Sequence, residues 1–159
     1  RMSVDAVKAH LKKYGMQDRF MEFSVSSATV ELAAAAIGCA PGEIAKTLAF
    51  YLNEGCLLIV AAGNTKIDNK KFKETFGVKA KMLQAQDVLP LTGHPVGGVC
   101  PFAAGEKAVI YLDESLKEFD FVYPACGAPN NCGRFTPQEL EEITQCLGWV
   151  DVCKGKDVE

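Results

Sequence analysis

The sequence has few of the side chains that most enzymes use for acid–base or metal chemistry. Its 159 residues include only two histidines, His10 and His94. Seven cysteines are present, but they are dispersed, and no two of them form a C-x-x-C pair. Four-ligand zinc sites are typically built from such pairs together with histidines. We therefore expect no metal in the functional site.

Long apolar runs and a strong net charge are also missing. No run reaches the roughly 18 apolar residues that a membrane span needs, and the first residues carry no apolar segment typical of secretion. The net charge is −3 at pH 7, so no overall positive field would recruit nucleic acid. Together with unpaired thiols, these features predict a cytoplasmic protein that binds neither membrane nor DNA. The length predicts a single domain over residues 2–159.

Several common enzyme motifs are absent as well, namely G-x-G-x-x-G, the Walker loop, H-E-x-x-H and the aromatic RNA-binding signature. The most unusual stretch that is present is Thr92–Phe102, which contains three glycines and two prolines in eleven residues. Glycine lets backbone N–H groups approach a ligand closely, and proline stiffens the chain. This loop is therefore either a surface turn or a backbone binding site.

Hydrophobic periodicity and capping signals predict interleaved helices and strands. Ser3, Thr29 and Asp68 are candidate N-caps, and Thr136–Glu139 is a capping box. We expect helical segments near residues 3–15, 30–37, 41–46, 68–76, 86–89, 114–118 and 137–148, and strands near 19–25, 47–52, 56–62, 78–83, 108–112, 121–125 and 149–152. The two apolar strands joined at Asn53–Gly55 predict a central antiparallel pair in a mixed sheet.

Lys46 is the first candidate for binding an anion. It lies at the predicted junction between a helical turn and an apolar central strand. Side chains at the ends of sheets converge on ligands in many proteins. A lysine there is either a solvated end of the strand or a phosphate anchor, and its position alone leaves both interpretations open.

His94 and Cys100 raise the alternative of a cysteine nucleophile. That chemistry needs the imidazole next to the thiol and usually a third group that orients it. A separation of six residues within one loop does not favour the pairing. We interpret Cys100 as a small pocket wall and His94 as a residue that structures the loop.

Three other features have a structural and a functional interpretation. Asp113 follows an apolar strand and is either a helix cap or a site residue. The segment Cys126–Asn131 is a second turn rich in Gly, Pro and Asn. The local excess of lysine is either a solvated helix face or a nucleic-acid footprint, and it comprises Lys66, Lys70, Lys71, Lys73, Lys79 and Lys81.

These features, in this order, resemble the editing domain of bacterial prolyl-tRNA synthetase and its free-standing relatives, the YbaK/EbsC-like aminoacyl-tRNA deacylases. The resemblance spans nearly the whole chain. It is carried by Ser27–Ala34 leading to Gly38, by Ile44–Phe50 with its lysine, by the G-x-x-x-P loop Gly97–Pro101 followed by Phe102, by the strand ending at Asp113, and by the turn with Ala125, Gly127, Pro129 and Asn130.

The resemblance implies an α+β fold with a mixed, mostly antiparallel, barrel-like central sheet surrounded by helices. It implies hydrolysis of the ester that joins a wrong, small amino acid (Ala, Ser, Thr or Cys) to the terminal ribose of a tRNA. The partner is then aminoacyl-tRNA, bound at its acceptor end, with a synthetase left open as a second partner. No metal and no organic cofactor are implied.

The family's functional residues transfer to matching positions of this sequence. The lysine matched by Lys46 would engage the acceptor end, and the matched loop would position the aminoacyl group through its backbone. The resulting catalytic set is Lys46, Gly97, Gly98, Val99, Cys100 and Pro101. The substrate-binding set is Ser27, Thr47, His94, Phe102, Asp113, Gly127 and Asn130. The lysine-rich segment of this sequence, and not a family match, supplies the expected tRNA-binding set Lys66, Lys70 and Lys71.

No Ser/His/Asp triad is visible, so we hypothesise that the ribose hydroxyl of the substrate activates the attacking water. Two departures from the family pattern flank the expected amino-acid pocket: Ala103-Ala104, where many relatives have a glycine after the phenylalanine, and the Cys126–Arg134 turn. A non-catalytic tRNA- or nucleotide-binding module on the same fold and a cysteine-dependent hydrolase remain as alternatives.

Overall fold

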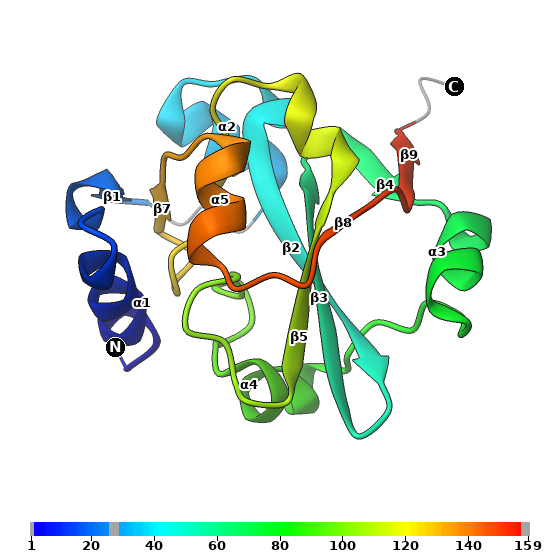
Figure 1. Ribbon diagram of the computed structural model, residues 1–159. Coiled ribbons are helices and arrows are strands. Elements are labelled where there is room, and N and C mark those ends of the chain that lie inside the picture. Colours follow the sequence, from blue (N-terminus) through cyan, green and yellow to red (C-terminus); the bar gives the residue numbers. More distant parts are fainter. Residues whose placement is uncertain (1, 26–28, 157–159) are drawn as a thin grey trace.

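The computed structural model describes residues 2–25 and 29–156, and its centre is a two-stranded hairpin (Figure 1). Strands β2 (Ile44–Leu52) and β3 (Gly55–Ala62) pair antiparallel from Ala45↔Ala62 to Leu52↔Gly55. Nearly every residue of β3 is buried, because side chains on both of its faces meet the core. This confirms the predicted pair and its central position.

Three shorter strands complete the central sheet in the order β6-β2-β3-β5-β8. They are β5 (Ala108–Asp113), β6 (Tyr123–Pro124) and β8 (Trp149–Val150). The α+β class and the mixed sheet are confirmed, but the expected predominance of antiparallel pairing is wrong, since β2–β3 is the one antiparallel pairing of four. The other strands arrive through long connections, which permit parallel neighbours.

Two small antiparallel ribbons flank this sheet. One pairs β1 (Phe20–Glu22) with β7 (Asn131–Gly133), and the other pairs β4 (Thr65–Ile67) with β9 (Cys153–Gly155). Each joins segments that are far apart in the sequence, so each ties an outer part of the chain to the sheet.

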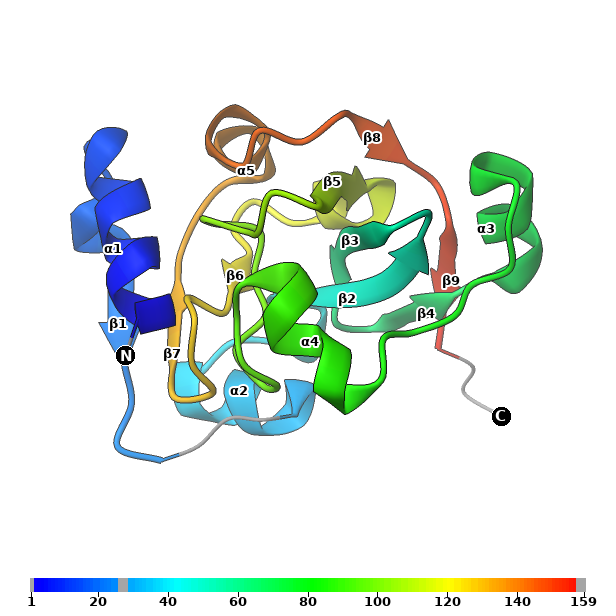
Figure 2. The ribbon, with the colours of Figure 1, turned by 90° about the horizontal axis from the view of Figure 1, so that it is seen from below.

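Helices cover both faces of the sheet (Figures 1 and 2). On one face, α1 (Met2–Lys13) and α5 (Pro137–Ile143) contribute Leu11 and Leu140 to the core. On the other face, Phe72 of α3 (Asn69–Phe76) packs on Phe50 of β2, with ring centroids 4.9 Å apart. The remaining helices are α2 (Val30–Ile37) and α4 (Ala85–Thr92). No helix in the described ranges is long and apolar enough to cross a membrane.

The predicted caps of α2 and α3 are confirmed. The Thr29 hydroxyl accepts a hydrogen bond from the Leu32 amide (3.1 Å), and Gly38 ends α2 with φ = 84°. Asp68 accepts hydrogen bonds from the first amides of α3, and Gly77 ends that helix with φ = 77°. The side chains that satisfy free helix ends were therefore correctly identified.

One predicted cap, one predicted boundary and one predicted strand differ from the structure. Ser3 lies inside α1, where its hydroxyl contacts His94 instead of capping the helix. Lys46 belongs to β2, because the 3₁₀ turn before it ends at Glu43. Residues 78–83 form only the single bridge Phe50↔Met82, so the expected strand lacks a paired neighbour over most of its length.

The other differences are in length. Helix α4 extends beyond the expected residues 86–89, and of the strand expected at 121–125 only β6 forms. The predicted capping box opens α5, but the helix ends at Ile143 rather than near Gly148. The reason is that the following backbone bonds to β5, through Leu147 N–H to the Ile110 carbonyl and through Leu112 N–H to the Gly148 carbonyl.

An ion pair fastens α5 to the segment after α1. Both terminal guanidinium nitrogens of Arg19, Nη1 and Nη2, donate to the Glu139 carboxylate at 2.8 Å. The same carboxylate accepts a hydrogen bond from the Thr136 amide in the capping box. The hydrogen bonds from Arg19 are the main cause that lowers the pKa of Glu139 from its ordinary 4.5 to about 2.

We predict that Glu139→Gln reduces stability at pH 7 by about 1 kcal/mol, because solvent reaches both partners of the pair. The folded pKa is depressed, so the contribution is complete above pH 4.5 and is lost as the pH falls toward about 2. Glutamine keeps the capping acceptor. Denaturant titrations from pH 7 to 2 should therefore converge for the two proteins, and parallel curves would contradict this assignment.

Candidate active site

A cavity of about 210 Å³ lies where β2 has a gap in its pairing. Strand β6 pairs with β2 only at Ile44 and Ala45, and the next pairing on that edge is the bridge at Phe50. Lys46 and Thr47 lie between these pairings and line the cavity. The edge of the sheet therefore opens at the residues predicted to bind substrate.

Two glycine loops form one wall of the cavity through backbone contact. A Cβ atom on Gly98 would lie 2.6 Å from the carbonyl carbon and oxygen of Gly127, so no side chain fits there. Gly97 has φ = 89° and approaches the ring of Pro129. A hydrogen bond from the Gly98 amide to the Pro95 carbonyl (2.9 Å) closes a turn in the first loop.

The second loop is held by the side chain of Asn131. Its Oδ1 accepts from the Cys126 amide (2.9 Å), and its Nδ2 donates to the Cys126 carbonyl (3.3 Å). Asn131 lines the cavity, whereas the predicted Asn130 offers its carbonyl to the Phe23 amide (2.8 Å). Asn131 is thus a residue that the sequence analysis did not single out.

Lys46 is half-buried at the side of the cavity toward β4. Its ammonium group donates a hydrogen bond to the carbonyl of Thr65, which is the first residue of β4. Burial lowers the pKa of Lys46, and the nearby charge of Lys156 lowers it further. An anionic ligand would relieve both effects, so this lysine is suited to hold a phosphate group.

Thr47 carries an unused polar group. Its Oγ1 is buried and has no hydrogen-bond partner among the residues that the structure describes. A buried hydroxyl left without a partner costs about 1–3 kcal/mol. Thr47 is one of the residues that line the cavity, so a polar group of a bound ligand is a candidate partner for this hydroxyl. Neighbouring residues of a strand face opposite sides, so Thr47 and Lys46 offer their groups from different directions.

Helix α2 supplies the apolar part of the wall through Val30, Ala33 and Ile37. None of these three residues is in the predicted site sets. Phe23 and Tyr123 also line the cavity. Their place at the cavity depends on the pairing of β1 with β7 and of β6 with β2, which the sequence did not predict.

His94 and Cys100 do meet, although their spacing did not favour it. The Cys100 Sγ lies 3.5 Å from the His94 Nε2, and both residues are fully buried outside the cavity lining. His94 Nε2 lies 2.7 Å from the Phe102 carbonyl, so it carries the proton, and Nδ1 accepts from the Ser3 hydroxyl. Burial raises the pKa of Cys100 to about 12. These features disfavour the cysteine nucleophile.

The other predicted residues divide by position. Pro101 and Phe102 are buried, and the Phe102 ring packs on Phe135 at 5.4 Å between centroids. Asp113 is buried outside the cavity lining and accepts hydrogen bonds from the amides of Ser115 and Val152 (both 2.9 Å). Of the predicted sets, the structure brings Lys46, Thr47, Gly97 and Val99 together around the cavity, with Gly98 and Gly127 joined behind it. Ser27 lies outside the described residues.

The predicted tRNA-binding lysines lie on β4 and α3. Lys66 and Lys70 are exposed. The Lys71 ammonium instead contacts the Asp151 carboxylate at 3.1 Å and the Cys153 carbonyl at 3.3 Å. Its charge is therefore partly offset within the protein.

The departure at Ala103 has a conformational consequence. Ala103 has φ = 52°, a left-handed conformation that glycine adopts without steric cost. The family glycine expected at this position therefore fits the backbone that the chain still adopts. Ala103 does not line the cavity, so this departure from the family pattern affects the loop backbone and not the cavity wall.

The cavity offers little acid–base chemistry of its own. Among the described residues that line it there is no Asp, Glu or His. Burial raises the pKa of Cys132, another lining residue, to about 12. In the described ranges, no three His, Cys, Asp or Glu side chains gather where they could hold a metal ion. The arrangement is suited to binding and positioning a polar ligand.

Comparison with known proteins identifies the family. Residues 25–143 match the model of the aminoacyl-tRNA editing domain. The match covers most of the chain and contains the cavity-lining residues from Thr29 to Cys132. The chain belongs to the aminoacyl-tRNA editing domain family.

Relatives and solved structures agree over nearly the full length. The uncharacterized protein YwhH of Bacillus subtilis (strain 168) is 49% identical over 155 residues, which cover 96% of this chain and 98% of YwhH. A crystal structure of a protein provisionally described as a trans-editing enzyme for prolyl-tRNA synthetase matches with a TM-score of 0.86 at 30% identity, over 98% of this chain and 99% of that one. The hypothetical protein APE2540 matches with a TM-score of 0.83 at 33% identity, over 94% and 99%.

We predict that Gly98→Ala destabilises the protein by about 1–3 kcal/mol, because the added methyl group would overlap the Gly127 backbone. Gly155→Ala is the control, since a Cβ there meets nothing within 4 Å. The control should remain within about 0.5 kcal/mol of wild type in urea unfolding. Equal stabilities of the two variants would contradict the loop contact.

Proposed function

We propose that the protein is an aminoacyl-tRNA deacylase that hydrolyses the ester of mischarged tRNA in trans. The observation that carries the proposal is that Lys46 and Thr47, whose buried hydroxyl has no partner among the described residues, both line a cavity in a chain of the editing-domain family. The solved structure described as a trans-editing enzyme for prolyl-tRNA synthetase supports the same activity class. A synthetase is a second candidate partner.

The residues have separate roles in this proposal. Lys46 holds the phosphate of the terminal nucleotide, Thr47 donates to or accepts from the aminoacyl group, and the Gly97–Val99 backbone faces the ester carbonyl. Water adds to the carbonyl carbon, the bond to the ribose oxygen breaks, and the free amino acid and the ribose hydroxyl are formed. Catalysis then rests on positioning and on N–H groups directed at the developing oxyanion.

The substrate side chain must be small. A cavity of about 210 Å³ lies below the roughly 300–1,000 Å³ typical of ligand sites. Helix α2 and Val99 restrict it with apolar groups. Alanine, serine, threonine and cysteine are the candidates, and such pockets separate side chains by only about 1–3 kcal/mol per methylene.

A second candidate function is a tRNA-binding module without turnover. The observation that favours it is the lack of Asp, Glu and His among the described residues of the cavity wall. Deacylation requires in its place a hydroxyl supplied by the substrate ribose. The two candidates therefore differ in turnover rather than in affinity.

We predict that one tRNA in a panel charged with alanine, serine, threonine, cysteine and proline is deacylated faster than background, and that Lys46→Ala slows this about 10- to 100-fold. The reason is the loss of a charged hydrogen bond worth about 1.5–3 kcal/mol. Release of the labelled amino acid measures the rate. The exposed lysine variant Lys107→Ala is the control.

Two outcomes would contradict parts of this prediction. Full activity of Lys46→Ala would remove its role at the acceptor end, and binding of every charged tRNA without turnover would favour the binding module. An additional substrate that lacks the vicinal ribose hydroxyl tests whether this hydroxyl activates the attacking water. Undiminished turnover of that substrate would exclude activation of water by the ribose.

We further predict opposite effects of Thr47→Val on activity and stability. Loss of a hydrogen bond to substrate should reduce kcat/KM about 2- to 10-fold, whereas the free protein should be unchanged or more stable by about 1 kcal/mol, because a buried hydroxyl without a partner is removed. Thr144→Val is the matched control. Its buried hydroxyl donates to the Leu140 carbonyl (2.7 Å), so that variant should lose about 1 kcal/mol. Loss of stability in Thr47→Val would contradict the assignment.

A further inference from the structure

The backbone groups of β2 alternate between its two edges. In an antiparallel strand, successive residues direct their N–H and C=O groups to opposite sides. The Ile44 carbonyl accepts a hydrogen bond from the amide of Gly63, the residue just after β3 (2.7 Å). The Ala49 carbonyl accepts one from the Leu83 amide (3.0 Å) on the other edge. Even-numbered residues of β2 therefore bond to β3, and odd-numbered residues face the outer edge.

The outer edge is paired on both sides of Thr47 but not at Thr47 itself. Strand β6 pairs with β2 as far as Ala45, and the segment around Met82 pairs with it from Ala49 onward. Across this edge, no described residue accepts from the Thr47 N–H or donates to the Thr47 C=O. The vacancy therefore spans one residue position, and it offers one backbone donor and one backbone acceptor.

A single amino-acid residue carries the groups that fill such a vacancy. In a hydrogen-bonded antiparallel pair, two opposite residues exchange both of their N–H···O=C bonds. An aminoacyl group holds its amine and its ester carbonyl on one Cα atom, as a residue of a strand does. Its amine would donate to the Thr47 carbonyl, and its ester carbonyl would accept from the Thr47 amide. The described residues of the cavity wall include no Asp or Glu to bind the amine, so a backbone carbonyl suits it.

This pairing also sets the direction of the substrate. An antiparallel partner runs opposite to β2, so the ester oxygen and the ribose point past Lys46 toward Ala45. The amine points toward Ala49, where the outer edge is paired again. On β2, the cavity lining includes Lys46 and Thr47 but neither Leu48 nor Ala49. The lysine suited to hold a phosphate thus lies on the ribose side, and the cavity ends on the amine side.

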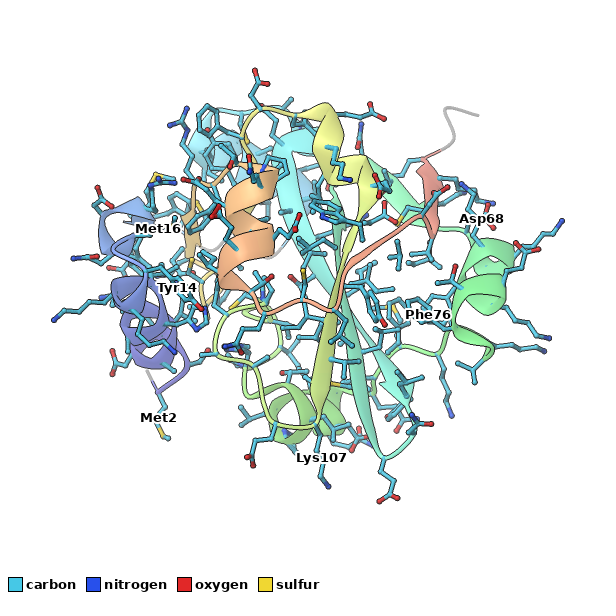
Figure 3. All side chains as sticks on the ribbon, viewed as in Figure 1. Met2, Tyr14, Met16, Asp68, Phe76 and Lys107 are labelled. Atoms are coloured by element: carbon cyan, nitrogen blue, oxygen red, sulfur yellow. The ribbon has the colours of Figure 1, made fainter. Side chains whose placement is uncertain are left out.

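The position of the substrate side chain follows from the same pairing. Opposite residues of a strand pair direct their side chains to one face, so an L-amino acid places its side chain beside that of Thr47. Ala45 shares this face and packs with Met16 on the α1 side, whereas Leu48 of the opposite face packs with Phe76 on the α3 side (Figure 3). A D-amino acid in the same pairing would direct its side chain to the opposite face, away from Thr47.

We propose that the open edge of β2 at Thr47 binds the aminoacyl group as a one-residue β-strand, and that the site therefore selects L-amino acids with a free amine. The inference rests on the proposed function and deepens it, because it assigns the amine and the ester carbonyl to backbone partners. The Thr47 N–H is then also directed at the oxygen that becomes negative when water adds to the ester. A carbonyl oxygen accepts two hydrogen bonds, which leaves one for the Gly97–Val99 backbone.

The first test measures hydrogen exchange of single amides by NMR, with and without an aminoacyl amide of 3′-amino-3′-deoxyadenosine, which lacks the labile ester. It carries the amino acid that the charged panel selects, or alanine if the panel shows no turnover. Protection of the Thr47 amide should rise about 5- to 10-fold at saturation, as expected for one new hydrogen bond. The Leu48 amide is the control, because it already bonds to β3. Unchanged protection at Thr47, with or without binding of the analogue, would overturn the proposal.

The second test compares tRNAs that differ only in the acyl group, namely the L-aminoacyl, D-aminoacyl and N-acetyl-L-aminoacyl esters. Each kcat/KM is divided by the rate of uncatalysed hydrolysis of the same ester. The D and N-acetyl esters should each fall about 10-fold or more below the L ester, because one loses its side-chain contacts and the other extends past the end of the cavity. Equal values for the L and D esters would contradict the pairing.

The variant Thr47→Val separates the backbone from the hydroxyl. It removes Oγ1 but keeps the N–H and C=O groups, so it should keep the preference for the L ester even though its kcat/KM falls. Loss of that preference would assign the selection to the hydroxyl and overturn the backbone pairing.

The outcomes also distinguish this inference from the proposed function. Turnover of a mischarged tRNA with equal L and D rates would keep the deacylase and refute the pairing at the edge. No turnover by the wild type, together with protection of the Thr47 amide by the analogue, would refute the deacylase and keep the aminoacyl site.

Discussion

The close approach of two backbones, at Gly98 and Gly127, is the constraint on which the candidate site depends. Because no side chain fits between them, the two loops act as one wall. That wall closes one side of the gap where β2 leaves Lys46 and Thr47 without a neighbouring strand. The start of α1 rests on the same contact, since Ser3 packs against Gly127 and binds His94.

Much of the fold could be predicted from local signals. The caps at Thr29 and Asp68 follow from side chains that satisfy the amides next to them in sequence. The apolar β2–β3 pair needed only a turn and two runs of hydrophobic residues. Where prediction failed, a distant partner decided the outcome. Ser3 forms a hydrogen bond with His94 instead of capping its own helix. After Ile143 the helix α5 ends, because the following backbone forms hydrogen bonds with β5.

Residues of the candidate site could be predicted where one short segment of sequence contains them, but not where the fold brings distant segments together. Gly97 and Val99 belong to the loop of unusual composition, Lys46 was singled out by its place at the start of a central strand, and Thr47 followed from the family resemblance. All four line the cavity. Asn131 was missed because the sequence gives no reason to prefer it over the neighbouring Asn130. His94 and Cys100 show the opposite case: their contact is real, but burial keeps it away from the cavity.

The two ribbons also show that the span of the family match is shorter than the folded unit. The family match covers residues 25–143, yet β1 and β9 lie outside it and are the partners of β7 and β4 inside it. Helix α1, also outside, fills the core with Val7 and Leu11. A chain trimmed to the matched span would retain Lys46 and Thr47 but lose Phe23 from the cavity wall, together with the segments that support the other walls.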